Sequence, residues 1–312
     1  MVIGCETGLD KESKMKITKP KKLEKGDTIG ILAVSGKIKE YEIIENAASY
    51  FEMCGFKVII SDTCKASHRY MAGNNDDDCV NALHSFFANE NINAILCARG
   101  GYGTLRLLNK IDWNVIAKNP KIFAGYSDIT TLLAMIFKKT GLMTFHSAMA
   151  NGDFGGEVED YTVKSFFDTL EGKRKKYISD NNLILKCGKA KGILWGGNLS
   201  TLSALCGTDF IPYNDIILFL EDLNEPVYKI DKMLTQLFNI EKLAKRVKGI
   251  AFGEFKDIED TKMLEEVEKE LVTRLNIPAS SGFKITHNKI KDTIPVGLTA
   301  ELDADKGIIT LL

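Results

Sequence analysis

The first half of the chain alternates short apolar runs with amphipathic stretches. Four runs rich in β-branched and other apolar residues predict strands, and a segment with apolar residues at helical spacing follows each of them. The predicted strands span residues 27–34, 57–61, 94–98 and 121–125, and the predicted helices span residues 41–54, 76–89, 104–109 and 128–139. Strands that alternate with helices in this way predict βαβ units and a parallel sheet.

The second half has a different pattern of predicted elements, because its strand-like segments lie closer together along the sequence. The predicted strands span residues 177–178, 183–185, 189–194, 216–220, 249–252, 293–296 and 308–311, and the predicted helices span residues 199–206, 226–238 and 261–275. This pattern predicts an α+β half with a mixed sheet. The expected division is a polar tail (1–18), an N-terminal α/β domain (19–160), a linker (161–180) and a C-terminal domain (181–312).

Composition and charge exclude several classes of protein. The chain has 41 basic and 42 acidic side chains, a net charge of -1, and 45% hydrophobic residues. The hydrophobic content excludes a disordered chain. The balanced charge argues against nucleic acid as the main partner. No apolar run approaches the roughly 18 residues that a membrane helix needs, and we expect no membrane partner. The N-terminus lacks the apolar region of a secretory signal.

The spacing of cysteines and histidines indicates the cellular compartment and whether a metal site is expected. The seven cysteines include no CxxC pair, which argues against a disulfide framework and against a zinc site of paired cysteines. This usage is typical of the reducing cytoplasm. The four histidines show no HExxH or similar spacing, so we expect neither a metal nor another cofactor.

The first candidate for chemistry is the turn Gly125-Tyr126-Ser127-Asp128, between a predicted strand and a predicted helix. A serine on such a sharp turn is held at the carboxyl edge of the sheet, beside N–H groups of the helix start that can stabilise an oxyanion. The alternative is that Ser127 only caps the helix, while Asp128 interacts with the helix dipole.

A glycine-rich turn, Arg99-Gly100-Gly101-Tyr102-Gly103, follows the third predicted strand. Glycines let backbone N–H groups approach a ligand closely, as in a phosphate or oxyanion loop. The turn fits neither the dinucleotide-binding nor the Walker pattern. The alternative is a tight turn that needs positive φ angles.

Three further features lie in the second half. Glu221 and Asp222 end an apolar strand, where a carboxylate either orients a histidine or serves only the dipole of the next helix. His287 lies in a loop, where a histidine is ordinarily a surface residue. The stretch Trp195-Gly196-Gly197-Asn198 precedes a helix and is typical of a tight turn with a cap, while Trp195 belongs either to the core or to a pocket wall.

The order of these motifs resembles the LD-carboxypeptidase family of serine peptidases. GYSD after a strand, then LFLEDLNEPVYKIDKMLTQL, then a glycine-led loop with His287 carry the resemblance, and RGGYG and GGNLSTL fit the same family. It covers about residues 20–312. The resemblance implies a Rossmann-like or flavodoxin-like N-terminal domain, a swivelling β/β/α C-terminal domain, an active site between them, and a homodimer.

The resemblance also implies roles for individual residues. A Ser-Glu-His triad maps onto Ser127, Glu221 and His287. The oxyanion donors would be the backbone N–H groups of Asp128 and Gly101, and the candidates for substrate binding are Arg99, Gly100, Tyr102, Trp195 and Asn198. The family's histidine often follows glycine directly, whereas Thr286 precedes it here, so the geometry of this loop is left open.

Three functions are in competition at this point. The first is a cytoplasmic LD-carboxypeptidase that releases the terminal D-Ala from muropeptide tetrapeptides in peptidoglycan recycling, which makes a small peptide the expected partner. The second keeps the triad but cleaves toxic aminoacyl-nucleotide analogues, as microcin C immunity peptidases do. The third is a non-enzymatic flavodoxin-like module that binds a phosphorylated ligand at the glycine-rich turn, in which case the three triad residues would lie apart.

Overall fold

The computed structural model describes residues 15–312. Residues 1–14, which include Cys5 and most of the predicted polar tail, lie outside the described residues. The end of that predicted tail already belongs to the fold. The Thr18 N–H donates to the Gly141 carbonyl at 2.9 Å, and the Thr18 carbonyl accepts from the Met143 N–H at 2.9 Å.

The N-terminal half forms a six-stranded sheet in the order β14-β7-β6-β5-β1-β2. All of its ladders are parallel except the one between β14 and β7, so the predicted parallel α/β sheet is confirmed. Its strands are β1 (Thr28–Leu32), β2 (Lys57–Ile60), β5 (Ala94–Cys97), β6 (Ile122–Gly125), β7 (Thr144–His146) and β14 (Ile294–Val296). β1, β5 and β6 are buried along their whole length, as expected of parallel strands covered on both faces.

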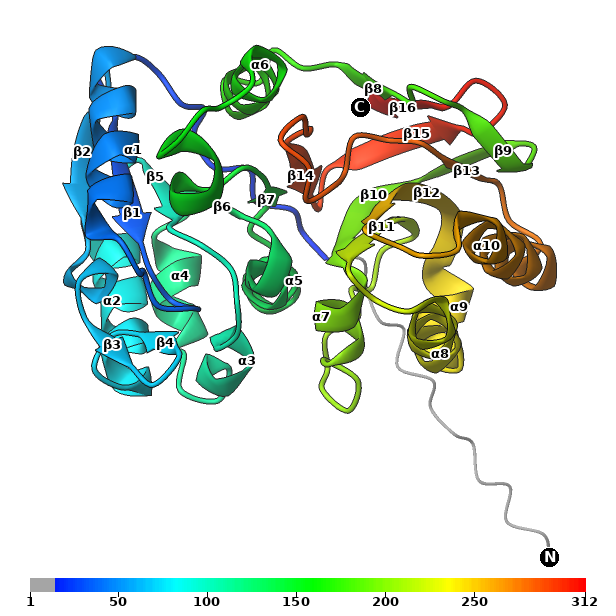
Figure 1. The fold of residues 1–312 in the computed structure, drawn as a ribbon, viewed down its shortest axis with the longest axis horizontal. Helices are drawn as coiled ribbons and strands as arrows, with labels where there is room; N and C mark the ends of the chain where they lie inside the picture. Colours follow the sequence, from blue (N-terminus) through cyan, green and yellow to red (C-terminus); the bar gives the residue numbers. More distant parts are fainter. Residues whose placement is uncertain (1–14) are drawn as a thin grey trace, which may run out of the picture.

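Helices cover this first sheet and connect its strands (Figure 1). They are α1 (Tyr41–Met53), α2 (Asp76–Ala88), α3 (Thr104–Leu107), α4 (Trp113–Lys118), α5 (Thr130–Thr140) and α6 (Asp160–Leu170). Short 3-10 turns lie at Asp62–Cys64 and Ser127–Ile129, a π-helical turn at Ala150–Phe154, and a small hairpin at β3 (Ser67–His68) and β4 (Met71–Ala72).

The C-terminal half forms the predicted mixed sheet, with eight strands in the order β8-β16-β15-β10-β11-β12-β13-β9. The central strands β10 to β13 are parallel, and the outer pairings are antiparallel. The strands are β8 (Lys176–Ile178), β9 (Leu183–Lys186), β10 (Lys189–Asn198), β11 (Ile216–Leu223), β12 (Val247–Lys256), β13 (Ala279–Ser281), β15 (Thr299–Asp303) and β16 (Ile308–Leu311). The helices are α7 (Leu199–Ser203), α8 (Val227–Phe238), α9 (Glu241–Arg246) and α10 (Thr261–Leu275).

Regular elements occupy much of the segment predicted as a linker, residues 161–180. Most of α6 falls within it, and the Phe166 ring of α6 packs against Phe51 of α1 and against Phe154, with centroid distances of 5.9 and 4.8 Å. α6 therefore belongs with the first sheet. β8 also falls within this segment, but it pairs with β16 of the second sheet.

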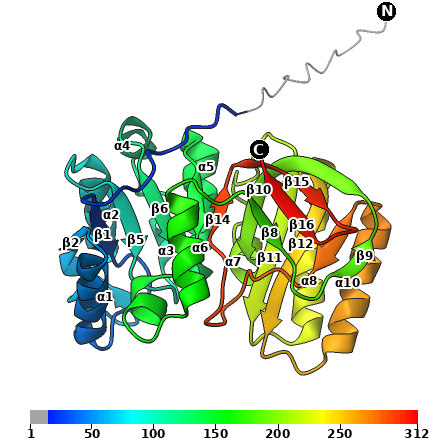
Figure 2. The same cartoon turned by 90° about the horizontal axis from the view of Figure 1, so that it is seen from above.

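The chain crosses back from the second sheet to the first after β13. The crossing segment, which we define as residues 282–293, leads into β14, and β14 pairs antiparallel with β7 so that Ile294 lies opposite His146. Both views show β14 between the two halves (Figures 1 and 2). The sequence predicted a strand here but not its place, since its partner strand lies about 150 residues earlier.

Two glycines let β10 run close to its neighbours. Gly196 and Gly197 have φ angles of +152° and +143°. A Cβ on Gly196 would lie 1.8 Å from the Phe219 carbonyl oxygen, and one on Gly197 would lie 2.6 Å from the Thr130 side chain of α5. A side chain at either position is therefore excluded by strand β11 or by α5.

We expect Gly196→Ala to lower the free energy of unfolding by about 2 kcal/mol or more, because it adds a backbone clash to an unfavourable φ angle. Gly156→Ala is the matched control, since a Cβ there has nothing within 4 Å, and its effect should stay within about 0.5 kcal/mol. Urea unfolding followed by circular dichroism measures both. Equal midpoints for the two variants would contradict the tight packing at Gly196.

Candidate active site

Ser127 lies on a strained turn at the carboxyl edge of the first sheet. β6 ends at Gly125, and a 3-10 turn that begins at Ser127 leads into α5. The φ angle of Ser127 is +63°, a left-handed conformation that costs a non-glycine residue about 1–3 kcal/mol. Such strain is concentrated at functional sites, which favours the nucleophile interpretation over a simple cap.

The glycine-rich turn packs directly on Ser127. A Cβ on Gly100 would lie 2.7 Å from the Ser127 Cβ and 2.9 Å from its Oγ, so only glycine fits there. Gly101 and Gly103 have φ angles of +122° and +152°, as the tight-turn interpretation requires. The two motifs that the sequence singled out in the first half therefore form one site.

The Asp128 side chain holds these loops together. Its carboxylate accepts from Ser35 Oγ at 2.6 Å and from the Thr104 N–H at 3.0 Å, and its backbone carbonyl accepts from Thr104 Oγ1 at 2.7 Å. The residue is buried, with 7% of its surface exposed. The backbone N–H groups of Asp128 and Gly101 lie on the two turns that these bonds hold together.

The second sheet brings Glu221 and His287 together. Glu221 lies near the end of β11, fully buried, and its Oε2 is 2.5 Å from His287 Nδ1. His287 Nε2 and Glu221 Oε1 are both buried and have no hydrogen-bond partner in the described chain. A carboxylate on Nδ1 orients an imidazole so that Nε2 faces the remaining space, which is the geometry of a general base.

The serine and the histidine adjoin through Tyr126. The Tyr126 ring lies edge-on to the His287 ring, with centroids 4.9 Å apart and an interplanar angle of 63°. No hydrogen bond joins Ser127 to His287 in residues 15–312. Catalytic hydrogen bonds are often long in the absence of substrate, so this separation does not remove the pair as candidates.

A buried ion pair fixes Tyr126. Lys291 Nζ, on the crossing segment, lies 2.7 Å from Asp153 Oδ1 and donates to the Tyr126 hydroxyl at 3.1 Å. The Lys291 and Asp153 side chains are each only 4% exposed. Burial raises the pKa of Tyr126 well above its usual value, as do the charges of Asp153 and Glu221, so the phenol remains protonated. Sequence reasoning missed this pair, because neither residue belongs to a recognisable motif.

Glu254 holds the residues on either side of His287. Its Oε2 accepts from Thr286 Oγ1 at 2.9 Å and from Asn288 Nδ2 at 2.6 Å, while the Asn288 N–H donates to Thr286 Oγ1 at 3.0 Å. The threonine that stands where the family often has glycine is therefore part of a hydrogen-bonded clamp. No sequence signal links Glu254, on β12, to a loop more than thirty residues later.

Three predicted substrate residues surround the serine turn. Gly100 contacts Ser127, as described above. Arg99 donates through Nε to the Gly100 carbonyl at 3.1 Å and through Nη1 to the Lys37 carbonyl at 2.9 Å. Tyr102 is 47% exposed, and its ring lies 5.7 Å from that of Tyr70.

The two other residues predicted to bind substrate, Trp195 and Asn198, are buried in this structure. Trp195 is 1% exposed and packs in the core, with its ring centroid 5.8 Å from that of Phe210. Asn198 caps α7 by accepting from the Thr201 N–H at 3.0 Å, and its Nδ2 donates to Asp222 at 2.8 Å. The interpretation of this stretch as turn and cap chemistry is the one that fits Asn198.

Among residues 15–312, no group of three or more His, Cys, Asp or Glu side chains is placed to hold a metal ion. The six cysteines of this range are free thiols. In the same range, no helix has the length and apolarity needed to cross a membrane.

Comparisons with known proteins identify both halves. A family model described as the LD-carboxypeptidase N-terminal domain matches residues 29–147, and one described as the LD-carboxypeptidase C-terminal domain matches residues 191–302. The two matches include every residue of the predicted triad: Ser127 in the first, and Glu221 and His287 in the second.

Whole-chain relatives agree with the family models. A probable murein peptide carboxypeptidase of Bacillus subtilis is 37% identical, with 91% of each chain covered. The crystal structure of an MccF-like protein of Bacillus anthracis is 29% identical, with a TM-score of 0.87 and 95% and 99% of the two chains covered. That of a muramoyltetrapeptide carboxypeptidase of Oxalobacter formigenes is also 29% identical, with a TM-score of 0.80 and coverage of 91% and 97%.

The geometry next to the site predicts the protonation behaviour of His146. This residue of β7 is buried, and its ring lies 6.0 Å from the Tyr126 ring and 5.5 Å from that of Phe219. Burial lowers its pKa to about 4, although the Glu221 charge acts in the opposite direction. His146 is therefore a neutral residue of the core.

We expect NMR titration to show no protonation of His146 above about pH 5. An unfolded histidine binds its proton near pH 6.5. The contribution of neutral His146 to the free energy of unfolding should therefore be fully present above pH 6.5. It should fall as the pH is lowered towards 4, by up to about 3 kcal/mol. The His146→Gln variant lacks this titrating group. The difference in free energy of unfolding between the variant and the wild type should therefore change between pH 6.5 and pH 4. A pH-independent difference would contradict the assignment.

Proposed function

The chain belongs to the LD-carboxypeptidase family, and we propose that it is a serine LD-carboxypeptidase that releases terminal D-Ala from muropeptide tetrapeptides during peptidoglycan recycling in the cytoplasm. Membership of this family makes the chain a peptidase of the murein peptide carboxypeptidase type. The observation that carries the finer proposal is the buried Glu221–His287 pair beside the strained Ser127 turn.

In the proposed mechanism Ser127 is the nucleophile. Its Oγ attacks the scissile carbonyl while His287 Nε2 accepts the proton, and Glu221 holds the Nδ1–H tautomer and stabilises the imidazolium. The collapse of the tetrahedral intermediate transfers that proton to the leaving amine, so that D-Ala departs and an ester remains on Ser127. Water then attacks the ester, His287 again moves the proton, and the tripeptide acid is released.

The developing oxyanion would be stabilised by the backbone N–H groups of Asp128 and Gly101. The Asp128 carboxylate supports this role, because it is bound to Ser35 and Thr104 and thereby fixes the glycine-rich turn against the start of α5. Donors fixed in advance stabilise a transition state without reorganisation during the reaction.

The terminal carboxylate of the substrate needs a cation near Ser127. Arg99 is our candidate, since its Nε and Nη1 are bound to backbone carbonyls while its Nη2 lies beside Gly101, 3.8 Å from where a Cβ would stand. A guanidinium held in this way presents its remaining donors in a fixed direction. Recognition is then local, which suits a chain whose net charge is only -1.

The second candidate is a microcin C immunity-type peptidase with the same triad. The similarity to an MccF-like protein favours it, and the exposed Tyr102 near the serine turn offers a surface on which a base could stack. Trp195, by contrast, is buried in the core and offers no exposed ring. The higher identity to a murein peptide carboxypeptidase, 37%, supports the muropeptide function.

We expect Ser127→Ala to retain the fold and to lower kcat for D-Ala release by about 10⁴-fold or more, because the reaction loses its nucleophile. Ser85→Ala, at an exposed position of α2, is the control and should keep full activity. Mass spectrometry of a tetrapeptide before and after incubation measures the loss of one D-Ala. Undiminished release by a folded Ser127→Ala protein would refute the proposed mechanism.

Competition between the two substrates separates the two candidate functions. When a muropeptide tetrapeptide and an aminoacyl-nucleotide analogue are incubated together with the purified protein, we expect D-Ala to appear first, because the chain is 37% identical to a probable murein peptide carboxypeptidase. Chromatography of D-Ala and of the released nucleotide follows both reactions. Release of nucleotide alone would reverse the order of the two proposals.

A further inference from the structure

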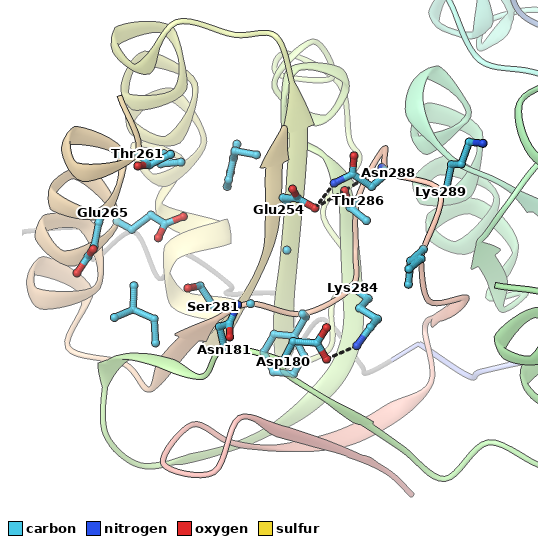
Figure 3. Close-up of a pocket in the computed structure, with 18 of the residues that line it drawn as sticks. Asp180, Asn181, Glu254, Thr261, Glu265, Ser281, Lys284, Thr286, Asn288 and Lys289 are labelled. Carbon is cyan, nitrogen blue, oxygen red and sulfur yellow. Dashed lines mark hydrogen bonds and ion pairs between the residues drawn. The ribbon is translucent and has the colours of Figure 1, made fainter. Parts of the chain in front are cut away.

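A cavity of about 900 Å³ lies beside the loop that carries His287. Its walls come from the end of β12, from α10, and from the crossing segment (Figure 3). Glu254, Thr286 and Asn288 form one side, and Thr261 and Glu265 of α10 lie on the other. The cavity therefore begins at the two residues that flank the histidine, although Ser127, Glu221 and His287 do not line it.

Carboxylates outnumber ammonium groups around this cavity. The acidic residues are Glu159, Asp180, Glu254, Glu265 and Glu268, and the basic residues are Lys262, Lys284 and Lys289. Two of the acids are neutralised, because Lys284 pairs with Asp180 and Lys269 pairs with Glu265. Glu254 and Glu268 have no cationic partner among the described residues.

Glu268 is the unusual member of this group. It is 4% exposed and lies on the buried side of α10 with Leu264 and Leu271, yet in residues 15–312 its carboxyl has neither a hydrogen bond nor an ion pair. Burial, and then the charge of Glu265, raises its pKa to about 8. A buried carboxyl without a partner destabilises a fold relative to a neutral residue of the same shape. Its presence on a cavity wall points to a ligand that neutralises it.

The ligand chemistry follows from the groups that are present. In the described part of the chain, no group of three or more His, Cys, Asp or Glu side chains is placed to hold a metal ion. An ammonium group needs only carboxylate acceptors, and apolar walls at Phe255, Leu264 and Phe283 suit the alkyl chain that carries it.

We propose that this cavity binds an alkylammonium group, held by the carboxylates of Glu268 on α10 and Glu254 on β12. Glu254 Oε2 is occupied by Thr286 and Asn288, and its Oε1 has no hydrogen bond within the described chain. An ammonium bound at Oε1 therefore contacts the clamp that holds the neighbours of His287. The amine has two sources: a side chain of the peptide substrate, which rests on the proposed function, or a separate small amine, which does not.

The first experiment measures binding directly. Isothermal titration with cadaverine compares the wild type with Glu268→Gln and with Glu270→Gln, which makes the same side-chain substitution on the exposed side of α10. We expect cadaverine to bind the wild type and Glu270→Gln equally, and the affinity to fall at least tenfold in Glu268→Gln. Thermal unfolding checks that each variant is folded.

The second experiment identifies the source of the amine. The kcat/KM is compared for two tetrapeptides that differ only in lysine or norleucine at the third position, with the wild type and with Glu268→Gln. A lysine preference of tenfold or more that disappears in Glu268→Gln assigns the cavity to the substrate. Cadaverine binding without any lysine preference assigns it to a separate amine.

The proposal is overturned if Glu268→Gln changes neither cadaverine binding nor the lysine preference. Failure of the proposed function has a different signature, because no tetrapeptide is then cleaved while the titration with cadaverine still reports on the cavity. The proposed function and the proposed amine site are therefore tested by separate measurements.

Discussion

The antiparallel pairing of β14 with β7 is the constraint on which the candidate site depends. Tyr126 and Ser127 follow β6 of the first sheet and Glu221 lies on β11 of the second, while His287 lies on the crossing segment that joins the two. Its polar residues are buried only because each has a partner. Lys291 pairs with Asp153, and Asp292 accepts from Ser165 Oγ at 2.8 Å and pairs with Arg174 at 2.7 Å. An unpaired charge at either position would be strongly destabilising. The two ion pairs therefore fix the position of the crossing segment.

This anchoring also explains why the two sheets present their functional residues to each other. In a parallel sheet the loops that follow the strands all emerge at the carboxyl edge, where ligands bind in open α/β folds. The serine turn follows β6, the glycine-rich turn follows β5, and Glu221 lies near the end of β11. Each half contributes the carboxyl edge of its sheet to the site. Lys291 of the crossing segment donates to the Tyr126 hydroxyl, and the Tyr126 ring lies against the His287 ring. Displacement of the crossing segment would therefore move the base relative to the nucleophile.

The sequence was sufficient for features that depend on local periodicity and insufficient for those that depend on distant contacts. α10 spans Thr261–Leu275, the range predicted from its helical pattern, and the Ser127 turn lies where the strand and helix patterns meet. The pattern predicted a turn at Gly196 and Gly197, but β10 continues through both, because their positive φ angles let the strand lie against β11 and α5. Trp195 lies on this continued strand and is buried in the core. The Glu254 clamp has no local signature, since its three residues meet only after β12 and the crossing segment are in place.

Polar groups without a partner among residues 15–312 lie at the catalytic cluster, and also in the core at His146 Nδ1 and Trp195 Nε1. His287 Nε2 and Glu221 Oε1 are buried without partners, and a nucleophile with its substrate would supply what they lack. Glu268 is also buried without a partner, but it lies outside the catalytic cluster, so the chemistry at Ser127 does not explain it. Asp292 shows that this fold gives a buried structural carboxylate several donors, because its Oδ1 accepts from Ser165, Tyr161 and Arg174. The contrast between Asp292 and Glu268 is therefore the reason to regard the second cavity as a binding site rather than as a packing defect.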